Sequence, residues 1–270
     1  MNILVCVKQV PNTKVTKIDP QLDPKTNTLI RSDIPAIANP FDEFAMELAA
    51  RVKDAHEGVQ ITVLSMGPAQ ADAVLKQCLS VGGDHAYLLS DPAFRGSDTL
   101  ATSFILSSAV RYLEEKEGRF DLIFCGKQAI DGETAQVGPE LAEYLGYAQA
   151  TYVTEVTAQD GGVEVNRETA DGYERIWVQY PAVLTITKTA YEPRLPSIKS
   201  KLASIRAVIP TFTAKELGLD PEKCGLKGSR TKVIRSCNPE KKAGCMKIKE
   251  ETGAESAHKL FDLLHSEHII

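Results

Sequence analysis

The residues best suited to chemistry in this chain form a polar turn at positions 126–140, Gly-Lys-Gln-Ala-Ile-Asp-Gly-Glu-Thr-Ala-Gln-Val-Gly-Pro-Glu. The turn follows the apolar run 122–125, which predicts a buried strand, and precedes a segment whose Val137, Leu141 and Leu145 share one helical face. Where a strand of a parallel sheet ends and a helix begins, free N–H groups and the helix dipole favour a phosphate. The same residues also suit an ordinary connecting loop in which Asp and Thr cap the helix. Spacing alone leaves both interpretations open.

The rest of the chain offers no other set of catalytic side chains. It has no G-x-G-x-x-G and no Walker motif, so ordinary dinucleotide and P-loop binding are disfavoured. It also has no recognisable catalytic triad, paired carboxylates or His-based acid–base set, so we expect no catalytic residues. His258, His265 and His268 crowd the C-terminal tail, but no acids or thiols are placed to help them bind a metal. We interpret them as solvated helix residues and expect no metal site.

The six cysteines follow no metal-ligand spacing, and no Cys-x-x-Cys occurs. Three lie within apolar segments and are expected to be buried thiols: Cys6, Cys78 and Cys125. Three lie in a polar tail, where they could be exposed: Cys224, Cys237 and Cys245. Reduced thiols in a cytoplasmic protein fit this usage best.

Composition and charge narrow the classes of protein. With 270 residues, 43% of them hydrophobic and 25% charged, the chain is typical of a soluble globular protein. The net charge of −5 argues against nucleic acid as the main partner, and we interpret the basic cluster at 199–206 as a solvated or partner-facing surface. No apolar run is as long as a membrane span, and the first residues lack the basic start of a signal peptide. We therefore expect a cytoplasmic protein without a membrane span.

Apolar, β-branched runs alternate with helical patterns in the first half of the chain. The runs predict strands at four places: 3–10, 61–66, 85–90 and 121–126. The helices between them are expected to begin near Asn39, Gly67 and Ser97, with Asn39 and Ser97 as caps and Pro40 in the first turn. The second helix is expected to turn four side chains inward: Ala73, Val74, Cys78 and Leu79. This alternation predicts an α/β fold with an open, doubly wound parallel sheet.

The pattern changes after Gly146. Four β-rich runs predict an antiparallel meander added to the main sheet: 151–157, 162–168, 173–179 and 183–188. From Tyr191 onward regular structure is sparse until a helical pattern at 256–266, whose apolar residues cannot form a core of their own. We therefore expect an α/β domain at 1–210 and an extended C-terminal arm at 211–270 that lies across another subunit.

Several separated motifs, in the right order, resemble the β subunit of electron-transfer flavoproteins. The match extends along most of the chain, roughly residues 1–210, and its motifs lie at 5–11, 39–42, 65–70, 98–103, 126–131 and 192–196. The resemblance implies an adenine-nucleotide-binding, Rossmann-like domain. It also implies a homologous α subunit that carries a second FAD and receives the 211–270 arm.

The resemblance places the cofactor against four loops at strand ends or helix starts, where a nucleotide is expected in an α/β sheet. The implied cofactor-binding residues are Cys6, Val7, Lys8, Asn39, Pro40, Phe41, Asp42, Met66, Gly67, Gly126, Lys127, Gln128, Ala129, Ile130, Asp131, Gly132, Glu133, Thr134, Ala135, Gln136 and Val137. Each loop taken alone has a plainer explanation, such as a core position for Cys6 or Met66 and a helix cap for Asn39.

The run Asp-Gly-Glu-Thr-Ala-Gln-Val-Gly-Pro at 131–139 is similar to the electron-bifurcating branch of the family, whose β subunit holds a complete FAD. Val137 offers no hydroxyl where an AMP monophosphate would end, and Gly132 lets the backbone approach a bulky diphosphate. The branch implies that NADH donates a hydride and that the electrons divide between ferredoxin and the α-subunit FAD with its partner dehydrogenase or reductase. The chain would thus be a redox subunit and not a stand-alone enzyme.

Two alternatives to the bifurcating branch remain open. One is a carrier-type β subunit that holds structural AMP and shuttles electrons from or to an acyl-CoA dehydrogenase. The other is a stand-alone adenosine-nucleotide-binding module, which explains neither the arm nor the 192–196 motif.

That last motif resembles the family's recognition loop, at about 191–200, which docks the partner dehydrogenase through an exposed leucine. The implied docking residues are Arg194, Leu195 and Pro196. Carrier-type members have a longer stretch between the arginine and the leucine, so the identity of the partner stays open.

Overall fold

The computed structural model describes residues 1–12, 22–23, 28–29, 35–234 and 244–270. Within these residues, nine strands form one sheet in the order β11-β10-β9-β12-β8-β1-β6-β7-β13. The parallel strands are β1 (Asn2–Cys6), β6 (Gln60–Met66), β7 (His85–Leu89), β8 (Leu122–Gly126), β12 (Ala182–Ile186) and β13 (Thr211–Phe212). The antiparallel strands are β9 (Ala148–Gln159), β10 (Gly162–Thr169) and β11 (Gly172–Gln179). Two small pairs stand outside the sheet: β2 (Gln9–Pro11) with β5 (Ala36–Ala38), and β3 (Leu22–Asp23) with β4 (Thr28–Leu29).

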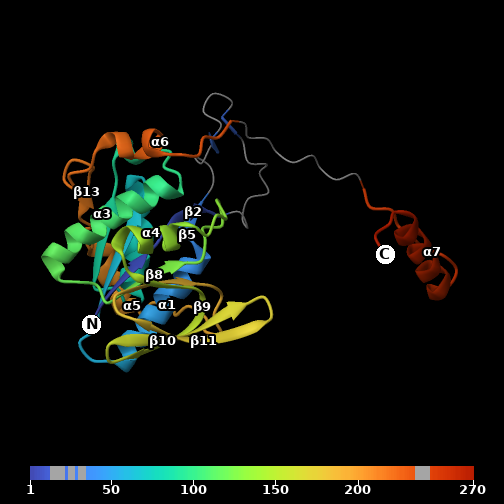
Figure 1. Cartoon of the computed structure of the whole chain (residues 1–270), viewed down its shortest axis with the longest axis horizontal. Coiled ribbons are helices and arrows are strands. Elements are labelled where there is room, and N and C mark those ends of the chain that lie inside the picture. The colour runs from blue at the N-terminus through green and yellow to red at the C-terminus, as the bar shows by residue number, and fades with distance from the viewer. Residues whose placement is uncertain (13–21, 24–27, 30–34, 235–243) are drawn as a thin grey trace.

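Helices cover both faces of this sheet. The helices of the described residues are α1 (Pro40–Ala55), α2 (Asp72–Ser80), α3 (Thr99–Glu117), α4 (Val137–Leu145), α5 (Ile198–Arg206), α6 (Gly225–Gly228) and α7 (Gly253–Ser266), the last of which lies away from the sheet (Figure 1). The described residues also contain three 3₁₀ turns, each between a strand and the next helix: η1 (Ala69–Ala71), η2 (Pro92–Phe94) and η3 (Pro221–Lys223).

Alternate residues of the central strands enter two separate hydrophobic cores. Val5 and Val63 pack on the face covered by α1 and α2, whereas Leu4, Leu64 and Ile123 pack on the face covered by α3 and α4. The strands are nearly continuous apolar runs because both of their faces are buried. The predicted doubly wound α/β fold is confirmed.

The meander has three strands, not the four that the sequence predicts. β12 lies between β8 and β9 and is parallel to both, so the run at 183–188 belongs to the parallel sheet. All five of its residues are buried, as is typical of a parallel strand covered on both faces. β9, β10 and β11 are antiparallel to one another and extend the sheet on that side.

Two predicted helix details are wrong. Asp98, not Ser97, caps α3: its carboxylate accepts from the Ala101 N–H at 3.0 Å, while the Ser97 hydroxyl donates to the Phe94 carbonyl oxygen. In α2 the predicted Val74 and Cys78 are buried, but Ala73 is exposed and Leu75 is buried instead. The helix begins at Asp72 after a 3₁₀ turn, which rotates its buried face.

The C-terminal part of the chain stays on the α/β domain for longer than the predicted boundary at 210. β13 joins the sheet beside β7, and Ala214 and Cys224 are buried in the core with α3. The Asp98 carboxylate accepts from the N–H groups of Arg230 and Thr231 at 2.7 and 2.8 Å. Residues 211–231 are therefore part of the domain, because strand pairing and these bonds attach them to it.

Helix α7 lies apart from the domain (Figure 1). It begins at Gly253, a few residues before the predicted start, and Thr252 and Glu255 form a capping box at that end. None of its residues is buried, and Leu260 and Phe261 are about half exposed. That it packs on a partner subunit stays a prediction.

The cysteines follow the sequence interpretation only in part. Cys78 and Cys125 are buried as expected, and Cys6 is half-buried. Cys224 is buried as well, contrary to the expectation of an exposed tail residue, because its segment packs against the domain. Cys245 is exposed, and Cys237 lies outside the described residues.

Candidate functional site

The four predicted cofactor loops meet at one edge of the sheet. β1 lies between β6 and β8 and is parallel to both, with Cys6 in register with Cys125. The carboxyl ends of these strands therefore lie side by side, followed by the loops that begin at Val7, Gly67 and Lys127. The start of α1 reaches the same edge, because the Asn39 side chain bonds to the loop after β8.

The Asp42 side chain joins three of these loops through hydrogen bonds. Its carboxylate accepts from the Lys8 N–H at 2.7 Å, the Gly126 N–H at 3.1 Å and the Asn39 Nδ2 at 2.9 Å. Burial raises the pKa of Asp42 to about 7, and the three N–H donors oppose part of that rise. The carboxylate is buried and bonded to the chain itself, so its role in the site is structural.

Asn39 has a similar role. Its Nδ2 donates to the Gln128 carbonyl oxygen at 2.9 Å, and its Oδ1 accepts from the Ile130 N–H at 3.2 Å. The residue is 1% exposed and, although it stands at the N-cap position of α1, its side chain does not cap the helix. The amide is used instead to shape the loop at 126–137.

Gly126 allows this close packing. A Cβ at this position would lie 2.2 Å from the Asp42 Oδ1 and 2.8 Å from the Phe41 carbonyl carbon. A real Cβ atom does not approach other heavy atoms so closely, so any side chain here would push Asp42 out of its bonds. Gly138 is restricted in the same way, because a Cβ there would lie 2.3 Å from the Thr185 Cγ2.

Two ammonium groups lie along the loop. The Lys8 Nζ is 2.7 Å from the Asp131 Oδ1 and its side chain remains about half exposed. The Lys127 Nζ lies 4.9 Å from the ring centroid of Tyr152 and 5.7 Å from that of Phe41. These contacts hold both charges near the loop. Because an ammonium group has three hydrogen-bond donors, each can still donate to an anion.

The middle of the loop has an unusual backbone. Glu133 and Ala135 have φ values of 52° and 54°, in the left-handed region that non-glycine residues rarely adopt. Among the described residues, no acceptor meets the N–H groups of Thr134, Ala135 and Gln136, which directly precede α4. Such a turn at a helix N-terminus can bind a phosphate.

A side chain at Gly132 would have space around its first atom, because nothing lies within 4 Å of a Cβ built there. At the end of β6, the Ser65 hydroxyl is buried without a hydrogen-bond partner among the described residues. Both features suit a site shaped for a group other than the chain's own side chains.

The predicted site residues therefore divide into three sets. Asn39 and Asp42 shape the site from within, and Val7 is buried in the hydrophobic core. The residues that stay at least partly accessible are Cys6, Lys8, Pro40, Phe41, Met66, Gly67 and 126–137. Tyr152 is a further site residue that sequence reasoning missed. It has φ 59° beside an irregularity in β9, and no local pattern in the sequence indicates that its ring meets Lys127.

No group of His, Cys, Asp and Glu within the described residues could hold a metal ion. In the same part of the chain, no helix is long and apolar enough to cross a membrane.

Comparison with known proteins decides the family. The electron transfer flavoprotein domain model matches residues 26–217. The chain is 45% identical over 259 residues to an electron transfer flavoprotein subunit beta of Megasphaera elsdenii, covering 95% of this chain and 94% of the relative. The chain belongs to the electron transfer flavoprotein β-subunit family.

Two further relatives match over most of their length. One is the caffeyl-CoA reductase-Etf complex subunit CarD of Acetobacterium woodii, 43% identical over 270 residues with all of both chains covered. The other is the protein FixA of Azorhizobium caulinodans, 41% identical over 247 residues, covering 90% of this chain and 86% of the relative.

The loop that resembles the family's recognition loop combines a fixed and an exposed residue. Arg194 is bonded to Glu47 of α1, whereas Leu195 next to it is 90% exposed. Ser197 caps α5 by accepting from the Ser200 N–H at 3.0 Å, so the helix begins directly after the loop. Apolar side chains then continue along the exposed surface: Ile198, Leu202, Ile205 and Val208.

Proposed function

We propose that this chain is the β subunit of an electron-bifurcating electron-transfer flavoprotein. In this proposal it pairs with an α subunit that carries a second FAD, and it binds an FAD of its own. The complex takes a hydride from NADH and divides the two electrons, one to ferredoxin and one to the α-subunit FAD and a partner dehydrogenase or reductase.

The loop between β8 and α4 is the observation that carries this proposal. It has N–H groups without an acceptor in the described chain at Thr134–Gln136, the ammonium groups of Lys8 and Lys127 nearby, and open space at Gly132. Charge-assisted bonds from such groups suit a pyrophosphate. These residues fit the phosphate part of FAD.

The site favours FAD over AMP on one further point. Val137 is the first residue of α4, where a hydroxyl would help to end a monophosphate, and it has none to offer. The bound FAD would supply the hydride and one-electron chemistry, since the chain has no acid–base set of its own. The side chains described above would bind and orient it.

The relatives support the same assembly. CarD, which matches from end to end, is by its name a subunit of a reductase–Etf complex. The exposed Leu195 and the apolar surface of α5 suit a protein partner, and α7 has an apolar side that its own domain does not cover. We assign the first surface to the dehydrogenase or reductase and the second to the α subunit.

The deciding experiment is the flavin content of the purified heterodimer. Two FAD per heterodimer support the proposal, whereas one FAD with one AMP identifies a carrier-type subunit. The same preparation is then mixed with NADH without any dehydrogenase. Bleaching of the flavin absorbance supports NADH as donor, and a complex with two FAD that does not bleach would contradict that assignment alone.

A further inference from the structure

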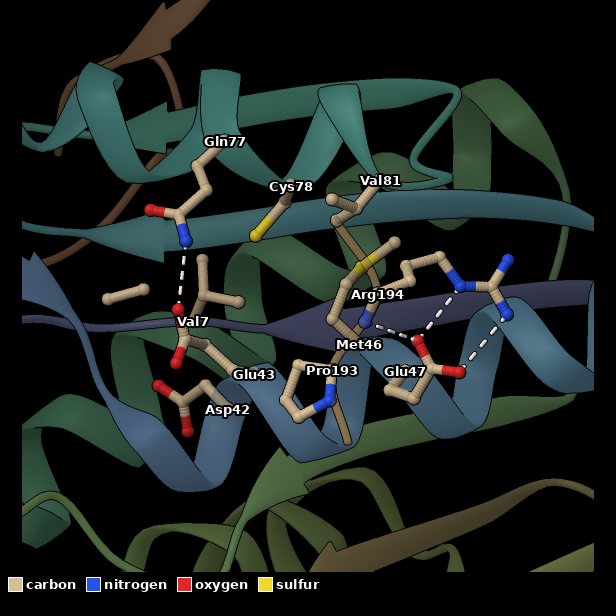
Figure 2. A pocket seen from close by; sticks show the side chains of 11 residues that line it. Val7, Asp42, Glu43, Met46, Glu47, Gln77, Cys78, Val81, Pro193 and Arg194 are labelled. Carbon is tan, nitrogen blue, oxygen red and sulfur yellow. Dashed lines mark hydrogen bonds and ion pairs between the residues drawn. The ribbon is translucent and has the colours of Figure 1, made fainter. Parts of the chain in front are cut away.

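Helix α1 carries a buried carboxylate that the nucleotide site does not use. The Glu47 side chain is 3% exposed and faces the pocket between α1, α2 and the segment Pro193–Arg194 (Figure 2). A buried charge is costly unless it is paired and hydrogen-bonded. Glu47 therefore needs the partners that surround it.

Those partners belong to the proposed docking loop. The Glu47 Oε2 accepts from the main-chain N–H of Arg194 at 3.0 Å and from its Nε at 2.8 Å, and the Oε1 accepts from its Nη2 at 3.2 Å (Figure 2). Asp54, about two turns further along the same face of α1, accepts from the same Nη2 at 2.8 Å. Both the backbone and the side chain of Arg194 are thus fixed to α1, one residue before Leu195.

A second arginine extends the same contact. The Arg51 Nε donates to the Glu47 Oε1 at 3.0 Å, and its guanidinium stacks 3.7 Å from the ring centroid of Tyr191. Tyr191 is the first residue of the loop. Glu47 therefore holds the loop at two points: at its start, through Arg51, and at Arg194, directly before Leu195.

We propose that Glu47 is a positioning residue for partner docking, which holds the loop at 191–196 so that Leu195 stands out from the surface. The inference rests on the proposed docking function of Leu195. A loop held in its bound form loses less conformational entropy when a partner binds. This explains how an apolar side chain that is 90% exposed can still have a defined position.

The position of Glu47 in α1 gives the contact a further meaning. Asp42, which ties the cofactor loops together, lies five residues earlier in the same helix, about 7.5 Å along its axis. One short stretch of helix therefore holds both the cofactor loops and the docking loop, and it keeps the docking point at a constant distance from the cofactor site.

The first test is amide hydrogen exchange on the intact heterodimer. Glu47→Gln places an NH₂ group against the donors of Arg194 and removes the charge. We expect the Arg194 amide to exchange at least about 10-fold faster, since its charge-assisted bond is lost. The matched control is Glu43→Gln, one helical turn earlier, whose carboxylate accepts from the Gln77 Nε2 and not from the loop (Figure 2). An unchanged exchange rate in Glu47→Gln overturns the proposal.

The second test asks whether Glu47 acts through Leu195. The KM for the dehydrogenase that co-purifies with the heterodimer is measured for Glu47→Gln, Leu195→Ala and the double variant. We expect Glu47→Gln to raise this KM about 10-fold alone and to add almost nothing in the Leu195→Ala background, because residues that act as one unit are not additive. A merely structural Glu47 lowers the melting temperature and leaves the KM unchanged.

The outcomes separate this inference from the proposed function. Additive effects on KM overturn the positioning role in docking. A Leu195→Ala variant with unchanged KM, together with faster Arg194 exchange in Glu47→Gln, overturns the docking function while Glu47 still holds the loop. If Glu47→Gln does not assemble, Arg194→Lys keeps the charge but loses the two-pronged contact, and it gives the same readouts.

Discussion

At the cofactor edge, the polar side chains of Asn39 and Asp42 are buried and bonded to the chain itself, whereas at the docking edge Leu195 and Ile198 are apolar and 90% and 82% exposed. Both edges are attached to the same helix, α1. At the first, buried side chains bond to the chain itself, and the N–H groups of residues 134–136 have no acceptor among the described residues. The second presents exposed hydrophobic surface, which is typical of a contact with another molecule.

This difference indicates how each edge is expected to fail. Changes that disturb the buried bonds of Asn39 and Asp42 at the cofactor edge affect folding together with binding. Changes at the docking edge remove a contact with a partner and leave the subunit intact. The four predictions below test this contrast, from the largest expected effect to the smallest.

Gly126→Val is expected to have the largest effect. The Cβ of the valine alone would lie 2.2 Å from the Asp42 Oδ1, so the hydrogen bonds through which Asp42 joins three loops must break. We expect a loss of more than about 3 kcal/mol in the free energy of unfolding, because a buried carboxylate loses its partners. The measurement is the yield and thermal unfolding of the heterodimer. Normal yield with an unchanged melting temperature would show that the cofactor edge is not tied together through Asp42.

Asp42→Asn is expected to change how stability depends on pH. The pKa of Asp42 is raised to about 7 in the folded state from 3.8, so the native state keeps this proton longer than the unfolded state. The native state is therefore stabilised by its tighter hold on this proton. This stabilisation is fully present below about pH 4 and is lost as the pH rises through 7, which changes the free energy of unfolding by a value on the order of 4 kcal/mol. Asn does not titrate, so the variant should lack this decline.

The check is to follow the unfolding midpoints of wild type and Asp42→Asn from pH 4.5 to 8. The gap between the unfolding midpoints of wild type and variant should narrow as the pH rises. A gap that widens would mean that the three N–H donors outweigh burial and that the carboxylate stays ionised in the fold.

The parallel core was predictable because it depends on local patterns. Runs such as 61–66 are apolar and β-branched, and they form strands wherever both faces of a sheet are covered. The order of the cofactor loops also follows, since strand ends of a parallel sheet share an edge. The parallel pairing of the run at 183–188 was not predictable, because the sequence of a buried strand does not indicate which neighbour it pairs with.

Contacts between distant residues account for the rest of what the sequence did not show. Glu47 and Arg194 are 147 positions apart, and Asp98 meets Arg230 across 132. Nothing near Glu47 in the sequence indicates that its charge is buried, and it has the helical spacing of an ordinary surface acid. The residues that could bind a cofactor were recognisable, but the residues that hold them in place depend on the tertiary fold.

Leu195→Ala addresses the docking edge. A buried hot-spot residue at an interface is typically worth about 2 kcal/mol or more, so we expect electron transfer to the partner dehydrogenase to slow roughly 30-fold. Heterodimer assembly, flavin content and melting temperature should stay within error of the wild type, since the side chain has almost no contacts in its own subunit. A fall of several degrees in melting temperature with normal electron transfer would contradict the contrast between the edges.

Gly132→Val is the mildest of the four changes and the closest control for Gly126→Val. Gly126 ends β8 and Gly132 lies in the loop between β8 and α4, but a Cβ at Gly132 meets nothing within 4 Å. The melting temperature of the flavin-free protein should therefore not change. If the loop receives the FAD pyrophosphate, the valine crowds the ligand and weakens β-site flavin binding by about 1 kcal/mol, the net value of one hydrogen bond. This appears as a five-fold or so rise in the flavin dissociation constant at that site, with the α-site flavin unaffected. Equal loss from both sites would point to a general folding defect, and full retention at both would place the diphosphate elsewhere than at Gly132.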